Sequence, residues 1–345
     1  MLRRVAPAFA LFFLSPLVAE FLLGDFTVAA LPVLFFVAPL YGGGALLIRE
    51  VTRRTGRGWP TIGLLALAYG VLEEGIFTQS LFNPNYAGEH LLQRGFIPAL
   101  GIAVPWTLFV LALHTVWSIS VPIALVESGS RRASAPWLRT PGLIVTSVLF
   151  LLGAAATTLS SWAHGRFWAS WPQLITVLVI AVLLVVAAFL VPSVKPRASV
   201  ASPLVLFVVT LAAGALFMGG MRLGTVPAVI AMLVAFAAVL GALIAWARTP
   251  AHVLAAASGG ALTYAWHSFF LHPLMGGGPV ITPVSRVVFA LAAVFLLTVL
   301  WRRRAWSDED HGGRSSGGAA GDAGRGGGGD ALVRGPAASA PRAEG

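Results

Sequence analysis

Cysteine is missing from all 345 residues of the chain, and lysine occurs once, at Lys195. Without cysteine the protein can form no disulfide bond, bind no metal through thiolates and use no cysteine nucleophile. Charged residues are also scarce, at 10% of the chain against roughly 25% in a typical soluble domain. Hydrophobic residues make up 57%. This composition excludes an ordinary soluble fold and leaves oxygen and imidazole groups to carry any chemistry.

Apolar windows of about 20 residues, the length needed to cross a bilayer, recur along nearly the whole chain. We therefore predict an all-α polytopic membrane protein with ten transmembrane helices, in a domain of residues 1–305. The predicted spans are Val5 to Leu23, Thr27 to Ile48, Pro60 to Phe82, Gly101 to Glu127, Pro141 to Leu159, Pro172 to Val191, Ala201 to Gly219, Val226 to Ala247, Ala251 to Leu271 and Val284 to Trp301. The first is interpreted as a helix and not as a cleaved signal peptide, because its apolar run resumes past Glu20.

The formal charge of +10 marks topology and does not indicate nucleic-acid binding, because the basic residues are not gathered on one soluble face. With the N-terminus inside, fifteen of the 23 basic residues lie on the cytoplasmic side and four on the opposite side. This bias is what the positive-inside rule requires, and it places both termini in the cytoplasm. We interpret these cations, Arg49 and Arg53 included, as solvated anchors.

Residues 306–345 are rich in Gly, Ala and Ser and poor in apolar bulk, so we expect a disordered cytoplasmic tail. The excess of arginine over lysine indicates a GC-rich coding sequence. A bacterium, and its plasma membrane, are the expected source and location.

Two neighbouring carboxylates, Glu73 and Glu74, interrupt the third predicted span within "AYGVLEEGIFTQS". An ionised side chain at the bilayer centre costs about 3 kcal/mol, so the pair needs a polar cavity or a proton. Helical spacing places Glu74 on a stripe of small residues that lets another helix approach. That stripe consists of Gly63, Ala66, Gly70 and Thr78.

In the fourth predicted span, His114 shares a helical face with Thr107 and Ser118. His114 and Glu73 reach a similar depth in antiparallel helices, so a hydrogen-bonded Glu–His pair is geometrically possible. A core histidine satisfied by Thr or Ser is the open alternative. His267, in the ninth span, is a candidate third member, or else an interfacial histidine in an aromatic belt.

The Glu-Glu pair followed some forty residues later by an intramembrane histidine resembles the CPBP (Abi-type) intramembrane proteases, relatives of the CAAX-prenyl endopeptidases. Their pattern is E-E-x-x-x-R, then F-x-x-x-H, then H-x-x-x-N or D. Here the first motif reads "EEGIFT", with Thr78 at the arginine position, and the second reads "VLALH", with Val110 at the phenylalanine position. No third motif follows at the family's distance, since His267 lies far downstream.

The resemblance implies that Glu73 acts as general base on a water, that His114 helps to orient it and that Glu74 supports the network. It also implies a membrane-embedded peptide or protein substrate. The sequence requires no cofactor. A divalent metal such as zinc, held by a Glu and by His114 or His267, would be another way to activate the water. Thr78 and Ser118 are secondary candidates.

Two other functions fit the same residues. In a proton-coupled transporter or carrier, Glu73 and Glu74 would exchange protons; the absence of a visible internal repeat counts mildly against it. In a non-catalytic assembly partner, the pair would only dock another helix. The bilayer is the expected environment in every case, and nucleic acid is not an expected partner.

Overall fold

The computed structural model describes residues 2–192 and 201–317. Contacts divide the chain into a unit of Met1–Trp301 and a second unit of Arg302–Gly345, and the description below concerns the first. Within the described residues, nine helices are long and apolar enough to cross a membrane. The predicted all-α polytopic class is confirmed.

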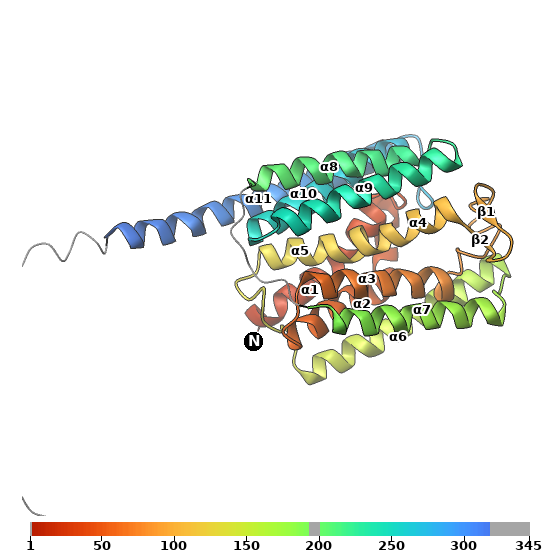
Figure 1. The fold of residues 1–345 in the computed structure, drawn as a ribbon, viewed down its shortest axis with the longest axis horizontal. Coiled ribbons are helices and arrows are strands. Elements are labelled where there is room, and N and C mark those ends of the chain that lie inside the picture. The colour runs from red at the N-terminus through yellow and green to blue at the C-terminus, as the bar shows by residue number, and fades with distance from the viewer. Residues whose placement is uncertain (1, 193–200, 318–345) are drawn as a thin grey trace, which may run out of the picture. The chain divides into compact units, whose positions relative to one another are not determined.

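Eleven α-helices, several shorter helical segments and one small hairpin make up the described chain (Figure 1). In order they are α1 (Leu2–Pro16), η1 (Leu17–Leu22), η2 (Val28–Val33), α2 (Leu34–Arg54), α3 (Trp59–Leu72), η3 (Glu73–Phe77), β1 (Phe96–Ile97), β2 (Ile102–Ala103), α4 (Val104–Ala112), η4 (Leu113–Ser120), α5 (Val121–Ser128), α6 (Thr140–Gly165), α7 (Trp171–Leu190), α8 (Pro203–Gly220), α9 (Thr225–Trp246), α10 (Pro250–His267), η5 (Ser268–Phe270) and α11 (Ile281–Gly317). The strands β1 and β2 pair antiparallel in the loop between η3 and α4.

The ninth predicted span corresponds to α10, which is the one predicted span missing from the nine apolar helices of the described chain. Ser258, Thr263 and Tyr264 are all buried in this helix, so its polar atoms face protein and not lipid. Helix α10 packs against α8 and α5. Burial within the bundle explains why α10 can be less apolar than the helices around it.

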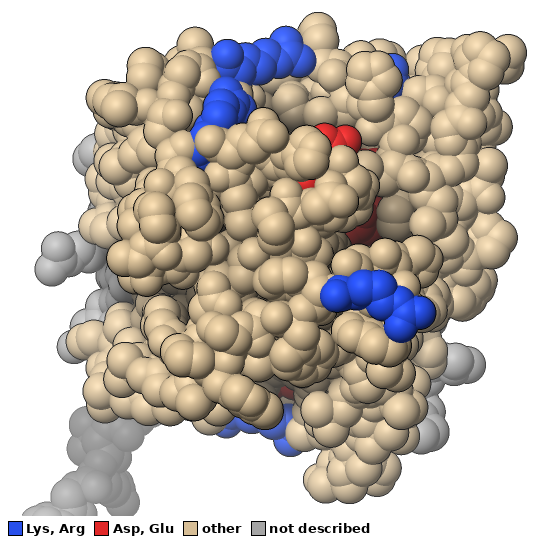
Figure 2. All heavy atoms as spheres, turned by 90° about the vertical axis from the view of Figure 1, so that its right-hand side faces the viewer, with Lys and Arg blue, Asp and Glu red and all other residues tan. Residues whose placement is uncertain are grey.

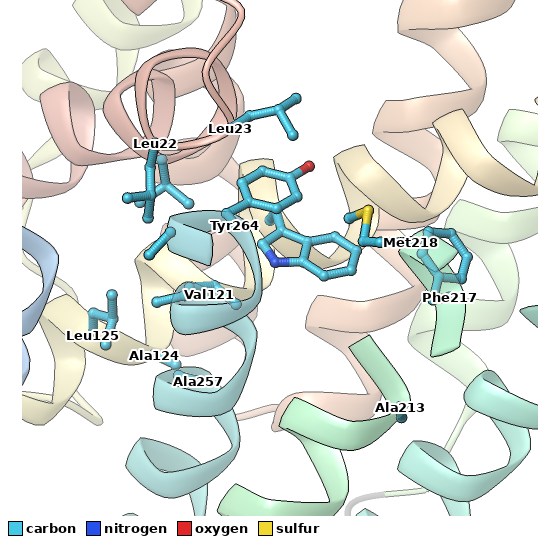
Figure 3. Packing of buried hydrophobic residues seen from close by; sticks show 14 of the residues in the cluster. Leu22, Leu23, Val121, Ala124, Leu125, Ala213, Phe217, Met218, Ala257 and Tyr264 are labelled. Atoms are coloured by element: carbon cyan, nitrogen blue, oxygen red, sulfur yellow. The ribbon is translucent and has the colours of Figure 1, made fainter. Parts of the chain in front are cut away.

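The apolar core joins η1, α5, α8 and α10 around a pair of stacked rings (Figure 3). The ring centroids of Trp117 and Tyr264 lie 4.7 Å apart at an interplanar angle of 3°, and the Trp117 indole donates to the carbonyl of Gly260 at 2.7 Å. Glycine permits the close approach of α8 and α10, because a Cβ at Gly259 or Gly214 would collide with a threonine side chain of the other helix. Small residues at such contacts let van der Waals packing hold helices together in lipid.

Large apolar side chains on α6, α7 and α11 remain exposed, among them Leu151, Leu183 and Phe295. In a membrane-spanning helix these surfaces face acyl chains. Helix α11 continues to Gly317, past the boundary predicted at residues 305/306. The rest of the predicted tail, residues 318–345, lies outside the described residues, and its disorder stays a prediction.

Arg49 is not the solvated anchor that we predicted, because its side chain is fully buried at the end of α2. Its guanidinium pairs with Glu50 at 2.6 Å and Glu127 at 3.0 Å, and stands 3.5 Å over the ring of Trp137. Arg53 also binds Glu127, at 2.6 Å. A buried charge needs a partner, and the carboxylate at the end of α5 supplies one.

The same cluster fixes the loop between α5 and α6. Glu50 accepts hydrogen bonds from the backbone N–H groups of Trp137 and Leu138, at 2.8 and 3.2 Å. Arg49 donates to the carbonyls of Ala133 and Ala135, at 2.6 and 2.8 Å. This buried ion cluster therefore ties α2, α5 and the loop between α5 and α6 together.

Removing the carboxylate at Glu50 should destabilise the protein. Glu50→Ala removes one of the two carboxylates that neutralise the buried guanidinium of Arg49. Losing one member of a buried ion pair costs about 3–5 kcal/mol of folding free energy. Thermal unfolding in detergent should show a clear drop for Glu50→Ala and none for Arg131→Ala, an exposed charge in the same loop. Equal melting temperatures for the two variants would contradict this account.

The predicted topology can be tested without removing any native cysteine. A membrane-impermeant maleimide applied to intact cells should label Glu89→Cys, in the exposed loop after η3, and leave Arg131→Cys unlabelled. After permeabilisation both should react. The reverse pattern would show that the positive-inside assignment is inverted.

Candidate functional site

Three of the short helical segments, η1, η3 and η4, are π-helical, and each carries ionisable side chains. Glu20 lies on η1, Glu73 and Glu74 on η3, and His114 on η4. A π-helical turn interrupts the α-helix and is often found at functional sites. The three interruptions therefore mark one candidate region from three different spans.

Proline helps to explain the interruption in the fourth span. Pro122 has no N–H to donate to the carbonyl of Ser118 four residues earlier. The Ser15 hydroxyl from α1 donates to that carbonyl instead, at 2.6 Å. The freed backbone group is thus satisfied by a neighbouring helix, as buried groups in lipid require.

His114 lies between the two glutamates of η3. Its Nε2 is 2.6 Å from Oε1 of Glu74, and its Nδ1 is 3.0 Å from Oε2 of Glu73. All three side chains are buried, with 1%, 5% and 6% of Glu73, Glu74 and His114 exposed. The structure thus brings together the three residues that the sequence singled out, in the expected Glu–His contact.

Glu74 has a full set of hydrogen-bond partners. Its Oε2 accepts from the hydroxyls of Thr78, at 3.1 Å, and of Ser80. The Trp106 indole donates in turn to the Ser80 hydroxyl, at 3.3 Å. Thr78 was expected here, whereas Ser80 and Trp106 were not. Both lie outside the helical stripe from which the site was predicted.

Glu73 is less completely bound. Its Oε2 is buried and has no well-aligned hydrogen bond among the described residues, although Nδ1 of His114 is near. The hydroxyl of Tyr69 is also buried; it faces Glu73 but forms no well-aligned hydrogen bond. A buried polar atom without a partner costs free energy, so this corner of the site is suited to receive a ligand or water.

Aromatic rings and a glycine fix the imidazole. The Tyr41 ring stacks on His114 at 5.9 Å and 28°, and the Tyr69 ring meets it edge-on at 6.1 Å and 60°. A Cβ at Gly70 would lie 3.1 Å from Cβ of His114, so α3 approaches η4 closely at this position. Ser118 contacts Nδ1 of His114 at 3.3 Å, while the Thr107 hydroxyl donates to its own helix.

All four tyrosines of the chain face the same group of acids, a feature that the sequence reasoning missed. Tyr41 lies against Glu20, and Tyr69 against Glu73. Burial, and then the charge of Glu74, raise the pKa of Tyr86 in the loop before β1. Tyr264 on α10 faces Asp25 and Glu20. The feature of the sequence that could have indicated this grouping is the scarcity of tyrosine, which occurs only four times in 345 residues.

Glu20 and Asp25 extend the site beyond the three central residues. Burial, and then the charge of Glu20, raise the pKa of Asp25, which lies in the turn after η1. On the end of the bundle that carries β1 and β2, acidic atoms lie recessed in a hollow between helices (Figure 2).

His267 does not join this group in the structure. Its ring meets that of Trp266, and its charged neighbour is Arg222. Within the described chain, the group with the donors and spacing to hold a metal is Glu73, Glu74 and His114, whose donor atoms lie within 4.8 Å of one another. Mixed carboxylate and imidazole donors suit zinc-like ions. The expectation that His267 would share a metal with His114 finds no support in this arrangement.

Comparison with known proteins gives one match. A model described as "Uncharacterized membrane protein family" matches residues 9–307. No curated protein and no solved structure matches the chain. The match supports the membrane character of the protein and does not extend to the resemblance to intramembrane proteases.

Gly70 offers a test of how tightly α3 and η4 are joined. Gly70→Val should push His114 away and destabilise the protein by about 1–3 kcal/mol, the usual cost of overpacking. Gly63→Val, on the same helix with no atom within 4 Å of its added Cβ, is the matched control and should have little effect. Thermal unfolding in detergent measures both, and equal losses would refute the proposed close contact.

Proposed function

The chain belongs to this uncharacterized membrane protein family, and we propose that it is an intramembrane hydrolase that cleaves a membrane-embedded peptide or protein with a carboxylate-activated water. We further propose that it does so in the plasma membrane of a bacterium. The location rests on the arginine-rich composition and the charge bias of the loops.

The unequal bonding of the two glutamates is the observation that carries the proposal. Glu74 is fully occupied by His114, Thr78 and Ser80, so it serves to hold the imidazole. Glu73 keeps a buried oxygen, Oε2, that accepts no well-aligned hydrogen bond, although Nδ1 of His114 lies 3.0 Å from it. A general base needs a free lone pair directed at the proton that it removes, and Glu73 meets that condition.

In the proposed reaction, Glu73 removes one proton from a water whose oxygen attacks the carbonyl carbon of the scissile peptide. His114, fixed by Glu74, orients the water and stabilises the charge that develops. The C–N bond then breaks, and the proton held by Glu73 passes to the leaving nitrogen, so that the products are a carboxylic acid and an amine. General base catalysis of this kind typically contributes about 10²–10⁴-fold in rate.

A proton-coupled carrier is the second candidate, and the extent of the acidic group favours it. Glu20, Asp25, Glu73 and Glu74 are electrostatic neighbours, and the Tyr41 hydroxyl is hydrogen-bonded to Glu20. Acids that line an intramembrane path commonly exchange protons. In this function the glutamates would take up and release protons without attacking a peptide.

Glu73→Gln should abolish hydrolysis while leaving the fold intact. Full-length protein reconstituted in liposomes with a host membrane-protein fraction should generate new peptide N-termini, detected by labelling of amino groups and mass spectrometry. The variant should lose at least about 10²-fold in rate, because it lacks the general base. Glu89→Gln, which changes an exposed acid at the same end of the bundle, should cleave normally.

The other functions give different results in the same preparations. Absence of cleavage by the wild-type protein would refute the hydrolase. A pH-driven flux in liposomes that Glu73→Gln eliminates would establish the carrier instead. If neither assay responds and the substitution only abolishes co-purification of a membrane partner, the site serves assembly.

A further inference from the structure

Attack of water on a carbonyl leaves negative charge on the carbonyl oxygen, and the three central residues have no hydrogen-bond donor left for it. Both ring nitrogens of His114 face carboxylates, Nε2 at 2.6 Å from Glu74 and Nδ1 at 3.0 Å from Glu73. The imidazole therefore acts on that oxygen only through space. In the part of the chain that the structure describes, no lysine or arginine pairs with either glutamate. A directed hydrogen bond to the oxyanion must come from another residue.

The hydroxyl groups around the central residues are engaged, with one exception. Those of Thr78 and Ser80 donate to Oε2 of Glu74. That of Ser118 lies 3.3 Å from Nδ1 of the imidazole. Among the described residues, Tyr69 carries the one buried hydroxyl that has no hydrogen-bond partner. The residue is 4% exposed, so bulk water does not solvate this hydroxyl, and an acceptor that arrives with a ligand would satisfy it.

Tyr69 and Glu73 share one face of their span. They stand four residues apart at the junction of α3 and η3, a spacing that makes side chains neighbours on a helix surface. The Tyr69 hydroxyl faces Glu73 without a well-aligned hydrogen bond, and Oε2 of Glu73 is buried in the same state. A donor and a proton acceptor, both unsatisfied, thus lie at one corner of the site. Hydrolysis needs this combination, because the attacking water and the carbonyl oxygen are bound to the same carbon in the tetrahedral intermediate.

Packing fixes the Tyr69 ring from three other spans. Gly44 on α2 leaves the space that the ring occupies, because a Cβ at this glycine would lie 2.5 Å from Cε2 of Tyr69. The ring centroid lies 6.2 Å from that of Phe150 on α6 and 6.1 Å from that of His114 on η4. The hydroxyl is therefore held in position before the reaction begins. A donor that does not have to move stabilises a developing charge most effectively.

We infer that the Tyr69 hydroxyl is the donor that binds the oxyanion of the tetrahedral intermediate. As Glu73 takes a proton from the water, the water oxygen bonds to the carbonyl carbon and the π electron pair moves to the carbonyl oxygen. Tyr69 donates a hydrogen bond to that oxygen and keeps its own proton. When the pair re-forms the C=O bond, the C–N bond breaks and the leaving nitrogen takes the proton from Glu73. This role rests on the proposed hydrolase function and makes Tyr69 a catalytic residue of it.

Tyr69→Phe tests the inference, because it keeps the ring in its packing and removes only the hydroxyl. A peptide that the wild-type protein cleaves is synthesised and assayed with the full-length protein in liposomes. The kcat of Tyr69→Phe should fall about 10²–10³-fold, the usual cost of removing one oxyanion donor, while KM changes little. Thr146→Val is the matched control and should keep the wild-type kcat. It removes a buried hydroxyl of α6 that donates to the carbonyl of Gly142 in its own helix.

Two further measurements do not depend on turnover. The melting temperature of Tyr69→Phe in detergent should equal or exceed that of the wild-type protein, because the lost hydroxyl is a buried donor without a partner. A phosphinate analogue of the same peptide, with a PO2–CH2 group in place of the scissile amide, carries negative charge where the oxyanion forms. Its Kd should rise about tenfold or more in Tyr69→Phe and stay unchanged in Thr146→Val, since the hydroxyl binds the tetrahedral state.

A wild-type kcat in folded Tyr69→Phe protein would overturn the inference and leave the proposed hydrolase standing. An unchanged Kd for the phosphinate would show that the oxyanion binds elsewhere. A lower melting temperature of Tyr69→Phe would assign the hydroxyl to the support of the fold and overturn the inference as well. Absence of cleavage by the wild-type protein would remove both the proposed function and this role of Tyr69.

Discussion

The burial of carboxylates beside a histidine, away from bulk water, is the constraint on which the candidate site depends. Taking an ion out of water costs several kcal/mol, and the cost is recovered only through close partners. The chain provides them at short range: the imidazole of His114 reaches both glutamates, and hydroxyls from η3 and the following turn bind Glu74. The close approach at Gly70 and the rings of Tyr41 and Tyr69 hold that arrangement in place.

The two buried polar clusters differ in a way that separates structure from function. In the cluster around Arg49, ion pairs and backbone groups occupy both the guanidinium and Glu50, and the result is a fixed loop between α5 and α6. In the cluster around His114, Glu73 and Tyr69 keep polar atoms that form no well-aligned hydrogen bond. A fully satisfied network stabilises the fold, whereas an incomplete one leaves room for a ligand. We therefore propose that the function resides in the cluster around His114.

Helical periodicity was sufficient to predict the spans and the meeting of Glu73, Glu74 and His114. Those residues differ from their apolar surroundings, and antiparallel helices of known rise bring them to one depth. The role of Arg49 was not predictable in the same way. An arginine at the end of a predicted span gives the same sequence pattern whether its side chain faces water or packs against the end of another helix. Ser80 and Tyr86 lie in turns and loops, whose geometry the regular periodicity does not contain. The other three tyrosines lie on α2, α3 and α10, and the sequence does not show which face of each helix meets the site. The polarity of α10 likewise follows from its neighbours, since burial among α5 and α8 removes the need for an apolar surface.

The π-helical turns give the bundle a simple evolutionary route to new chemistry. Such a turn accommodates one residue more than the α-helix around it, so a single codon inserted into a lipid-facing span turns the side chains beyond it by about 100°. Loss of one codon within Leu113–Ser120 would restore the regular helix and rotate the rest of that span away from its present neighbours. Among relatives of this protein, the lengths of η1, η3 and η4 should therefore distinguish the members in which Glu73, Glu74 and His114 meet from those in which these helices only pack against one another.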